Sequence, residues 1–581
     1  MQLLRVNMDR LTVESQDLGD AYGSWAGRGL IARLLSDEVP AACDPLGPQN
    51  KLVVTNGLLA GTRTSSAGRL SVGAKSPLTL GIKEANAGGV MGDAMARQGV
   101  RAIVVEGTAP TESLYLLEIG AAGARLLPAD DLRGLGTYAV AAELLQRYGD
   151  TAALACIGPA GELRLPLAGV AVNDREGRPS RFAGRGGMGA VMGAKNLKAI
   201  VVLPDAPGDA PIHDMAAFRE ARKRLNEALR SNPVTGRLFA DLGTAMSLDI
   251  VRALGGMPIC NFSRGDSDGE LPYFTGDGFR QLIVDRGGEG TPTHACMPGC
   301  AIRCSNVFPD SEGTEIVGPL EYESLVLLGP NLGLFDVDQI ARLNYLCNDY
   351  GVDTMEAGVA LGVALEAGLA SFGDYEAIVA LLDEVPRGTV VGRVLGNGAT
   401  VAGRVLGVTR VPAVKGQGMA AYDPRAVKGF GVTYATSTMG ADHTAGYVMG
   451  AQVDHHSPVG AAQLSRKTQV LRAALDTINL CAFVMSALMD KPDILPDLIN
   501  AVHGTDYGPG FVGELGEAVL ASELAFNAAA GITVLDDRLP EFMRTEALPP
   551  QDVVFDVPQE ELDSLLRTDC ESSMQITGGT P

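Results

Sequence analysis

Three cysteines lie close together in the segment THACMPGCAIRCSN, residues 293–306, as Cys296, Cys300 and Cys304. A spacing of four would place them on one face of a helix, but Pro298 and Gly299 interrupt that pattern. We therefore expect a loop wrapped around a compact group. Three thiolates and one more cysteine make the Cys₄ ligand set of a cubane iron–sulfur cluster. Cys481, in DTINLCAF, is a candidate for the fourth ligand.

Zinc is the main competitor for this segment. Structural zinc sites usually take paired C-x2–4-C spacings, and His294 could join as a ligand. A radical enzyme that uses S-adenosylmethionine would show C-x3-C-x2-C, so the second gap here is one residue too long. A trio of unligated buried thiols is the remaining interpretation. We favour iron–sulfur because the rest of the chain has the features of a redox enzyme.

A glycine-rich segment, RFAGRGGMGAVMGAKNLK at 181–198, contains G-x-G-x-x-G at Gly184, Gly186 and Gly189. A dinucleotide fingerprint needs a strand directly before it and an acid about 20 residues later, and neither is present. Arg181 and Arg185 among backbone-exposing glycines still suit a phosphate-bearing ligand. A simple tight turn explains the segment equally well.

Two further loops carry the same kind of residues. SSAGRLSVGAKSPLT (65–79) offers Arg69 and Lys75, and KEANAGGVMGDAM (83–95) offers Asn86, Gly88 and Gly89. Backbone amides in such loops bind anions. The three loops together predict one large, polar, anionic ligand held by the N-terminal part of the chain.

The elements that must position these residues change character along the chain. Residues 1–205 contain short apolar runs between turns, such as KLVVTNGLL and KAIVVL, and predict a β-rich domain. A Pro-, Asp- and Gly-rich stretch at 204–214 predicts a linker. Apolar residues then recur at helical spacing, beginning with 215–230. We expect an α+β protein with a β-rich domain at 1–205 and helical domains at 206–412 and 413–581.

Composition excludes several classes of protein. The chain has 581 residues, 46% hydrophobic and 20% charged, so it can build a large core and is not disordered. No apolar run is long enough for a membrane span. A net charge of −22 disfavours nucleic-acid binding. Nine scattered cysteines and an N-terminus without a signal-peptide pattern predict a cytoplasmic location.

The chain resembles the tungsten-containing aldehyde ferredoxin oxidoreductases, from RVNM near the N-terminus to about residue 545. The densest matches are GRLSVGAKSPLT, NAGGVMGDAM, IGPAGE, GRGGMGAVMGAKNLKAI, ACMPGC, GPLEYES, GPNLG, YDPR, NDYGVD and DTINLC. The resemblance implies a buried tungsten, or rarely molybdenum, held by the dithiolenes of two pterins near a [4Fe-4S] cluster. It allows a magnesium ion between the pterin phosphates. It also implies a β domain beneath the pterins and two helical domains above them.

The resemblance assigns cofactor positions residue by residue. Arg69 matches an arginine between the cluster and a pterin. The positions that contact the pterins or their phosphates match Asn86, Gly88, Arg181 and Phe182, and Gly184 of the glycine-rich loop is grouped with them. Two D-x-x-G-L-[DC] segments hold the pterin rings in the family, and their acids accept hydrogen bonds from pterin amino groups. Their key positions here are Asn348, Val352, Asp353, Asp476 and Leu480.

The pterin segments depart from the family pattern at two positions. Asn348 replaces the usual first acid, and Asn479 replaces the usual glycine. One pterin is therefore expected to meet a neutral amide in place of a carboxylate.

The cluster loop and a metal-binding motif also differ. The family cluster pattern is C-x2-C-x3-C, whereas Thr293 occupies the first cysteine position here and Cys304 is extra. We infer that the ligands are Cys296, Cys300, Cys304 and Cys481. The family's dimer-bridging metal site uses E-x-x-H, and Arg342 and Tyr345 stand there. A homodimer of this chain would therefore lack the bridging metal.

Two residues match the family's active-site acid and histidine. Glu323, in GPLEYESLVLLG, precedes an apolar run, which predicts partial burial and a raised pKa suited to a general base. The alternative is an acid that merely suits a helix N-terminus after Pro319, which fits Glu321 better. His443, in TMGADHTAG, is expected to donate a hydrogen bond to a substrate carbonyl oxygen.

The resemblance implies interconversion of aldehydes and carboxylic acids, with electrons leaving through the cluster to ferredoxin or an iron–sulfur subunit. Two alternatives stay open. The same cofactors could serve another low-potential reduction, such as aromatic-ring reduction in a complex. The chain could also be a cluster-only electron carrier that has lost the pterins, although retention of Arg69, Asp353, Asp476, Glu323 and His443 argues against it.

Overall fold

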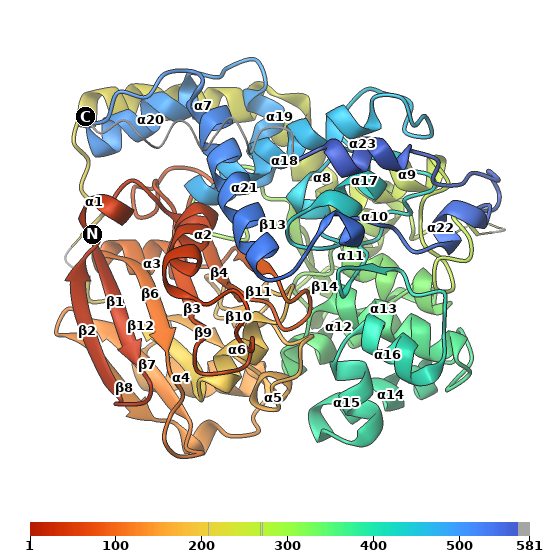
Figure 1. Cartoon of the computed structure of the whole chain (residues 1–581), viewed down its shortest axis with the longest axis horizontal. Coiled ribbons are helices and arrows are strands. Elements are labelled where there is room, and N and C mark those ends of the chain that lie inside the picture. The colour runs from red at the N-terminus through yellow and green to blue at the C-terminus, as the bar shows by residue number, and fades with distance from the viewer. Residues whose placement is uncertain (207, 268, 270, 567–581) are drawn as a thin grey trace.

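The computed structural model describes residues 1–206, 208–267, 269 and 271–566. Two β-sheets lie together on one side of the molecule, and the helices that follow them in sequence surround the rest (Figure 1). The α+β prediction is therefore confirmed. None of the helices in these described ranges is both long and apolar enough to cross a membrane.

Each of the two sheets has six strands. The first has the order β2-β1-β6-β3-β4-β5, in which β1 and β6 are parallel. Its strands are β1 (Gln2–Asn7), β2 (Thr12–Asp17), β3 (Leu52–Asn56), β4 (Leu70–Lys75), β5 (Ile82–Ala87) and β6 (Val100–Glu106). The second has the order β11-β10-β9-β12-β7-β8. Its strands are β7 (Tyr115–Gly120), β8 (Gly123–Pro128), β9 (Ala153–Cys156), β10 (Val170–Val172), β11 (Arg181–Ala183) and β12 (Leu197–Val202).

Apolar side chains from both sheets share one core. Strand residues such as Val72 and Ile200 pack there with the methionines of α3 (Met91–Arg97) and α6 (Met188–Ala194). The outer face of the first sheet is covered by α2 (Gly27–Glu38), and that of the second by α4 (Thr137–Tyr148). Because both faces are covered, β3, β4 and β12 are buried at every position, and β3 and β12 are mostly apolar.

The helical part begins where the amphipathic pattern predicts it. No described residue between Val202 and Met215 lies in a helix or strand, and Asp214 caps α7 (Met215–Ser231) by accepting from two backbone amides. The longer helices that follow are α10 (Gly276–Arg286), α12 (Val337–Tyr350), α13 (Thr354–Glu366), α14 (Tyr375–Arg387), α18 (Ala461–Ile478), α20 (Ile494–His503) and α21 (Phe511–Ala529). Shorter ones are α9 (Met246–Ala253), α11 (Tyr322–Leu327), α15 (Val390–Gly396), α16 (Ala399–Leu406) and α17 (Lys428–Thr436).

A small sheet interrupts this helical part, which the sequence pattern did not predict. It consists of β13 (Thr291–His294), β14 (Ser305–Pro309) and β15 (Glu315–Val317), all antiparallel. These strands are only three to five residues long, too short for a clear alternation of apolar and polar residues. The sheet has a clear role, because the cysteine-rich loop is the connection between β13 and β14.

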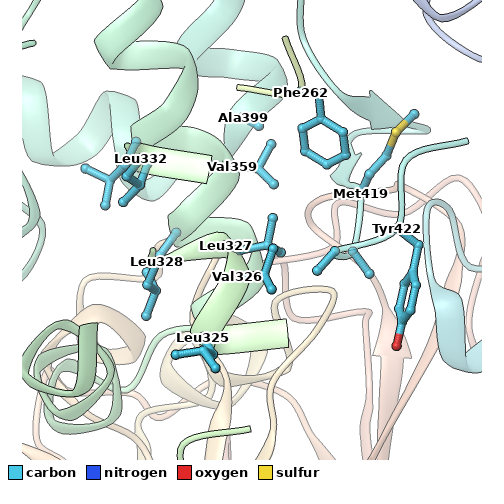
Figure 2. Close-up of a cluster of buried hydrophobic side chains, with 14 of the residues drawn as sticks. Phe262, Leu325, Val326, Leu327, Leu328, Leu332, Val359, Ala399, Met419 and Tyr422 are labelled. Atoms are coloured by element: carbon cyan, nitrogen blue, oxygen red, sulfur yellow. The ribbon is translucent and has the colours of Figure 1, made fainter. Parts of the chain in front are cut away.

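One hydrophobic cluster fixes the elements that carry the catalytic candidates. Leu325, Val326 and Leu327 of α11 are fully buried and pack in the same cluster as Val359 and Tyr422 (Figure 2). Burying a leucine or valine side chain contributes about 1.5–3 kcal/mol. The apolar run that follows Glu323 therefore anchors the helix that presents this acid.

Candidate active site

A buried cavity of about 250 Å³ lies where the N-terminal sheets meet the helices. It is lined mainly by charged and polar side chains. Four arginines (Arg28, Arg69, Arg185 and Arg472) and six acids (Glu84, Glu321, Glu323, Asp353, Asp442 and Asp476) face it. Burying so many charged groups costs desolvation free energy, unless the groups pair with one another or with a polar, charged ligand. The cavity has the chemistry of a site for a large anionic ligand.

Two arginines in this cavity have donor atoms without hydrogen-bond partners. Arg28 pairs with Glu523 through Nε at 2.7 Å, but its Nη1 makes no hydrogen bond and lies 3.5 Å from a carboxylate oxygen of Asp476. Arg472 donates from Nη2 to Asp476 at 3.1 Å, and its Nη1 is also unpartnered. Buried donors are nearly always satisfied in native proteins. These two point to a bound acceptor such as a phosphate or a pterin oxygen.

Glu84 faces Asp476 from the first sheet. Its carboxylate accepts from the Ser71 hydroxyl at 2.6 Å and from the Asn86 amide at 3.3 Å. Burial and the nearby charge of Asp476 raise the pKa of Glu84 to about 7. Two neighbouring buried carboxyl groups therefore line the cavity, one on β5 and one on α18.

The two pterin segments adopt the same local structure. Each begins in the last turn of a helix, α12 or α18, which ends at a residue in the left-handed region, Gly351 (φ +75°) or Asn479 (φ +61°). Asparagine tolerates this conformation better than other non-glycine residues, which explains how Asn479 replaces the glycine. Asn348 and Asp476 both line the cavity, as do Val352 and Asp353. The equivalent of Val352 in the second segment, Leu480, is buried in an apolar core.

Asn348 makes a hydrogen bond that an acid could not donate. Its side-chain amide donates to the Tyr138 hydroxyl at 3.4 Å. The Tyr138 ring stacks on Tyr345 with 4.6 Å between ring centroids. Tyr345 is thus engaged within the chain, at the position where the family has a metal-binding histidine. Asn348 and Tyr345, two of the departures from the family pattern, are therefore linked through Tyr138.

The four predicted cluster cysteines are brought together. Cys300, Cys304 and Cys481 are 7% exposed and belong to one buried cluster, with Cys296 packed against it. Residues 295–304 form no helix, as Pro298 and Gly299 predict. No three of these Sγ atoms lie within 4.8 Å of one another. Zn–S bonds of about 2.3 Å would hold four sulfurs about 3.8 Å apart, so the four sulfurs do not form a compact zinc site as they stand.

Arg69 connects this cysteine cluster to the cavity. Its guanidinium lines the cavity, hydrogen-bonds to Asn86, and interacts electrostatically with Cys481, Cys296 and Cys304. A hydrogen bond with Cys296 lowers the pKa of the Cys300 thiol to about 6, which favours its thiolate form. Arg69 thus lies between the cysteines and the cavity, and its role toward a pterin stays a prediction.

His294 faces away from the cysteines. Its Nε2 lies 3.0 Å from a Glu176 carboxylate oxygen, and its Nδ1 lies 3.2 Å from the Arg181 guanidinium. Among the described residues, His294, Glu176 and Asp174 are a trio whose ligand atoms are close enough for one metal ion. Arg178 contacts both acids of this trio. The positive charges of the arginines oppose a cation there, so His294 belongs to an ion-pair network.

The glycine-rich segment is used mainly for close packing. Gly184 lines the cavity, but a Cβ on Gly186 (φ +80°) would collide with the Lys83 side chain. A Cβ on Gly189 would collide with the backbone of Gly169. Two of the three glycines therefore make room for neighbours, and Arg185 is the charged cavity residue of this segment.

Three other predicted cofactor residues have mixed placements. Phe182 lines the cavity, whereas Arg181 bonds to the Ser305 hydroxyl at 2.7 Å and lies 3.8 Å from Glu321. Gly88 packs against the cluster loop, where a Cβ would contact Cys296 Sγ at 3.3 Å. The next residue, Gly89, donates its N–H to the Cys296 carbonyl at 2.8 Å. Gly88 therefore supports the cluster loop more directly than the cavity.

Glu323 lines the cavity and contacts His443. His443 Nε2 lies 3.1 Å from Glu323 Oε1, and the Tyr422 hydroxyl donates to the same oxygen at 3.0 Å. Burial alone would raise the pKa of Glu323, but His443 and Tyr422 together lower it below its usual value. The prediction of a raised pKa was therefore wrong, because two neighbours stabilise the carboxylate.

A second acid lies on the opposite side of His443. Asp442 Oδ1 is 4.0 Å from His443 Nδ1, and Asp442 pairs with Lys83 Nζ at 2.5 Å. Asp442 also caps the short turn that carries the histidine, by accepting from the Thr444 amide at 3.0 Å. Lys83, Arg185 and His443 hold the pKa of Asp442 well below its usual range despite burial. The turn is thus fixed by a buried ion pair.

Sequence reasoning missed several residues of this site. Tyr422 contacts an acid 99 positions away, and Lys83 an acid 359 positions away, so neither pairing can be read from a local pattern. Lys83 and Glu84 begin the segment KEANAGGVMGDAM, which was singled out for Asn86, Gly88 and Gly89, and Arg28 lies on a helix that carried no motif. Tyr422 lies in the motif YDPR.

Comparison with known proteins gives the family. The model for the N-terminal domain of aldehyde ferredoxin oxidoreductase matches residues 3–204, and the model for its domains 2 and 3 matches residues 220–568. The chain belongs to the aldehyde ferredoxin oxidoreductase family. The tungsten-containing aldehyde ferredoxin oxidoreductase of Pyrococcus furiosus is 32% identical over 576 residues, covering 94% of this chain and 92% of the relative.

One further relative and one solved structure of the same fold have names that point to other reactions. The WOR-like subunit of aliphatic sulfonate oxidoreductase from Pyrococcus furiosus is 24% identical over 96% of this chain and 92% of the relative. Among solved structures, the active-site complex BamBC of benzoyl coenzyme A reductase, with 1,5-dienoyl-CoA, has the same fold. Its TM-score is 0.81 at 19% identity, over 100% of this chain and 94% of that one. Family membership therefore fixes the class of enzyme but leaves the substrate open.

The residues present fit the cofactors that the family implies. Three buried cysteines and the half-buried Cys296 gather in one cluster and supply the four thiols that a [4Fe-4S] cluster needs, and Arg69 lies between them and the cavity. The unpartnered donors of Arg28 and Arg472, together with Asp353 and Asp476, suit the polar groups of a pterin. The thiols, arginines and acids of this chain could therefore hold the cofactors of a tungsten-containing enzyme, which is what the relatives at 32% identity are named as.

Proposed function

We propose that this enzyme interconverts aldehydes and carboxylic acids at a tungsten–bis-pterin centre, and passes electrons through a [4Fe-4S] cluster to ferredoxin or an iron–sulfur partner. The relatives at 32% identity are aldehyde oxidoreductases of this kind. When bound, the metal centre supplies two-electron redox chemistry and the cluster carries electrons singly. Magnesium between the pterin phosphates and molybdenum in place of tungsten stay predictions.

The chain's own residues would handle the substrate's oxygen atoms and protons. His443 contacts Glu323 and lies in sequence between the cavity-lining residues Asp442 and Thr444. We propose that its ring donates a hydrogen bond to the substrate's carbonyl oxygen, where negative charge develops. Glu323 stays ionised near neutral pH because its pKa is lowered, and its carboxylate can accept a proton from water or an aldehyde hydrate. Its low pKa makes it a weak base, so positioning by Tyr422 and His443 matters more than basicity.

The observation that carries this proposal is the convergence at one cavity. Glu323 from α11, His443 from a turn and Tyr422 from the loop before α17 meet within hydrogen-bonding distance. The same cavity is lined by Asp353 and Asp476 of the pterin segments. Arg69 joins it to the cysteine cluster. An electron carrier that had lost the pterins would have no use for this arrangement.

The test is an anaerobic assay of purified enzyme with a panel of aliphatic and aromatic aldehydes and a viologen acceptor. Viologen reduction that depends on aldehyde and scales with tungsten content supports the proposal. Enzyme that is fully loaded with metal and reduces viologen with none of the aldehydes would contradict it.

A second candidate keeps the cofactors and changes the reaction. Its basis is the fold shared with the BamBC complex over the whole chain, together with a sulfonate oxidoreductase relative. It predicts that the same loaded enzyme ignores aldehydes and oxidises the dienoyl thioester or a sulfonate with viologen. Adding those two compounds to the panel distinguishes the candidates in one experiment.

A further inference from the structure

The loop that carries three of the cluster cysteines lies at the surface of the molecule. Four residues between Cys296 and Cys304 are exposed: Pro298, Gly299, Ala301 and Arg303. Three of them have compact side chains, so the backbone of another protein can approach the cysteines closely here. Electron transfer slows steeply with distance, so this surface is where a partner that takes electrons from the cluster has to dock.

A short helix adjoins the loop on the surface. Gly243, directly after α8 (Phe239–Leu242), packs against it, because a Cβ there would meet the Cys304 carbonyl oxygen at 2.5 Å. At the start of α8, the ring centroid of Phe239 lies 4.2 Å from that of Phe483. Phe483 follows Cys481 by two residues. The start and the end of α8 therefore contact segments that carry cluster cysteines.

Two exposed apolar side chains belong to the neighbouring elements. The Asn232 side-chain amide donates to the Ser486 carbonyl oxygen at 2.6 Å, which ties the chain before η2 (Val234–Leu238) to α19 (Met485–Leu488). Leu238, the last residue of η2, is 39% exposed, and Met489, directly after α19, is 59% exposed. Because η2 leads into α8 and α19 follows the Phe483 turn, both side chains lie near the cysteine loop (Figure 1).

A third segment, residues 63–66, is also bonded to the cysteines' surroundings. The Ser65 hydroxyl accepts from the Ala301 N–H at 3.1 Å, and the Ser66 carbonyl accepts from the Cys481 N–H at 2.9 Å. Arg63, two residues before Ser65, is exposed. We call the exposed residues of these segments the cluster face: Arg63, Arg237, Leu238, Arg303 and Met489.

The cluster face has an excess of positive charge. Arg303 has no ion-pair partner among the residues that the structure describes. Each of the three neighbouring acids is paired with a cation: Asp209 with Arg63 at 2.8 Å, Asp241 with Arg237 at 3.7 Å, and Asp490 with Lys491 at 2.8 Å. Arg303 therefore leaves one uncompensated positive charge here, whereas the whole chain has a net charge of −22.

We propose, resting on the function proposed above, that the cluster face is the docking site of an acidic iron–sulfur protein of the ferredoxin class. Arginine and methionine are enriched at protein interfaces. The positive charge attracts an acidic partner and orients it on approach. A permanently bound subunit would need a larger and more apolar surface than Leu238 and Met489 provide. The composition of the face therefore suits a transient, salt-sensitive encounter.

Arg303→Glu in the tungsten-loaded enzyme tests the docking site. Binding of an acidic two-cluster ferredoxin to the immobilised enzyme is measured by surface plasmon resonance, together with aldehyde-dependent reduction of that ferredoxin and of a viologen. We expect Kd and KM for ferredoxin to rise at least about tenfold, because a like charge replaces an opposite one. The viologen rate, and tungsten and iron per chain, should equal those of the parent.

Arg404→Glu is the matched control. Arg404 is also exposed, and it lies on α16, which is well separated from α19 and β13 (Figure 1). This variant makes the same change of charge and should bind ferredoxin as the parent does. Met489→Glu provides a second test and should raise Kd several-fold. Added salt should raise Kd in the parent, and less so in Arg303→Glu.

The docking site is refuted if Arg303→Glu, or Met489→Glu where the former loses iron, binds ferredoxin as tightly as the parent. It is also refuted if the parent does not bind ferredoxin, if Arg404→Glu weakens binding equally, or if salt leaves the parent's Kd unchanged. A parent that reduces viologen with no aldehyde refutes the proposed function instead, and the binding comparison still decides whether the cluster face docks the partner.

Discussion

Replacing Glu323 by glutamine removes the proton acceptor and little else. Glutamine has the same shape, and its side-chain oxygen can still accept from Tyr422 and His443, which lie 3.0 and 3.1 Å from Oε1. Exchanging a charged acceptor for a neutral one weakens each of these two bonds by about 1 kcal/mol. The cost to folding should therefore stay near 2 kcal/mol, and the fold should survive.

The effect on catalysis should be much larger. A positioned general base contributes about 10²–10⁴ to the rate, which corresponds to about 2.7–5.5 kcal/mol of transition-state stabilisation. We expect kcat for Glu323→Gln to fall by at least about 100-fold, with a smaller change in KM. The pKa of Glu323 is lowered, so the parent should lose activity only as pH falls through the acidic range, and this acid limb should disappear in the variant.

The assay is anaerobic aldehyde-dependent viologen reduction, with rates normalised to tungsten per chain. Glu366→Gln is the control, because Glu366 is also partly buried and accepts from Arg410 at 3.0 Å, outside the cavity. Its variant should keep the parent rate. Equal tungsten content and a Glu323→Gln rate above about one tenth of the parent would refute the role of Glu323 as base.

Three further predictions concern the frame of the site. Cys304→Ser should lower the iron content per chain and abolish the spectrum of the [4Fe-4S] cluster. The control Cys43→Ser should change neither. An unchanged iron content in Cys304→Ser would exclude Cys304 as a ligand. Lys83→Met leaves the 4%-exposed Asp442 without its lysine and should cost about 3–5 kcal/mol in thermal unfolding at neutral pH. The pKa of Asp442 is depressed in the folded protein, so its ionised carboxylate stabilises the fold above its unfolded pKa, and this stabilisation is lost on acidification. The difference in free energy of unfolding between Lys83→Met and the parent should therefore narrow below about pH 4. A difference that does not change with pH would contradict this. Gly186→Ala should lower the free energy of unfolding by about 1–3 kcal/mol, because alanine is strained at φ +80° and its Cβ would collide with the Lys83 side chain. Thermal unfolding measures this loss, and unchanged stability would show that the glycine is dispensable.

Much of the fold could be predicted from the sequence because its signals are local. Short apolar runs predicted β3 and β12, and helical periodicity predicted α7. The β13–β15 sheet was missed because its strands of three to five residues carry too little periodicity.

The site was predictable only in part. Cys296, Cys300 and Cys304 lie within one segment, so their spacing predicts a ligand role, and the family resemblance suggested Glu323 and His443. Tyr422, Glu84 and Lys83 were missed because their partners come from distant segments. The pKa of Glu323 was predicted with the wrong sign, since the apolar run suggested burial and gave no sign of the two donors.

Tungsten, iron and aldehyde-dependent viologen reduction, measured together on one anaerobic preparation of the parent enzyme, test the central claim most directly. The account predicts about one tungsten (or molybdenum) and about four irons per chain, with a rate that scales with the heavy metal. Preparations with about four irons and neither heavy metal, from cells supplied with both, would contradict it. So would a fully loaded enzyme that oxidises no aldehyde.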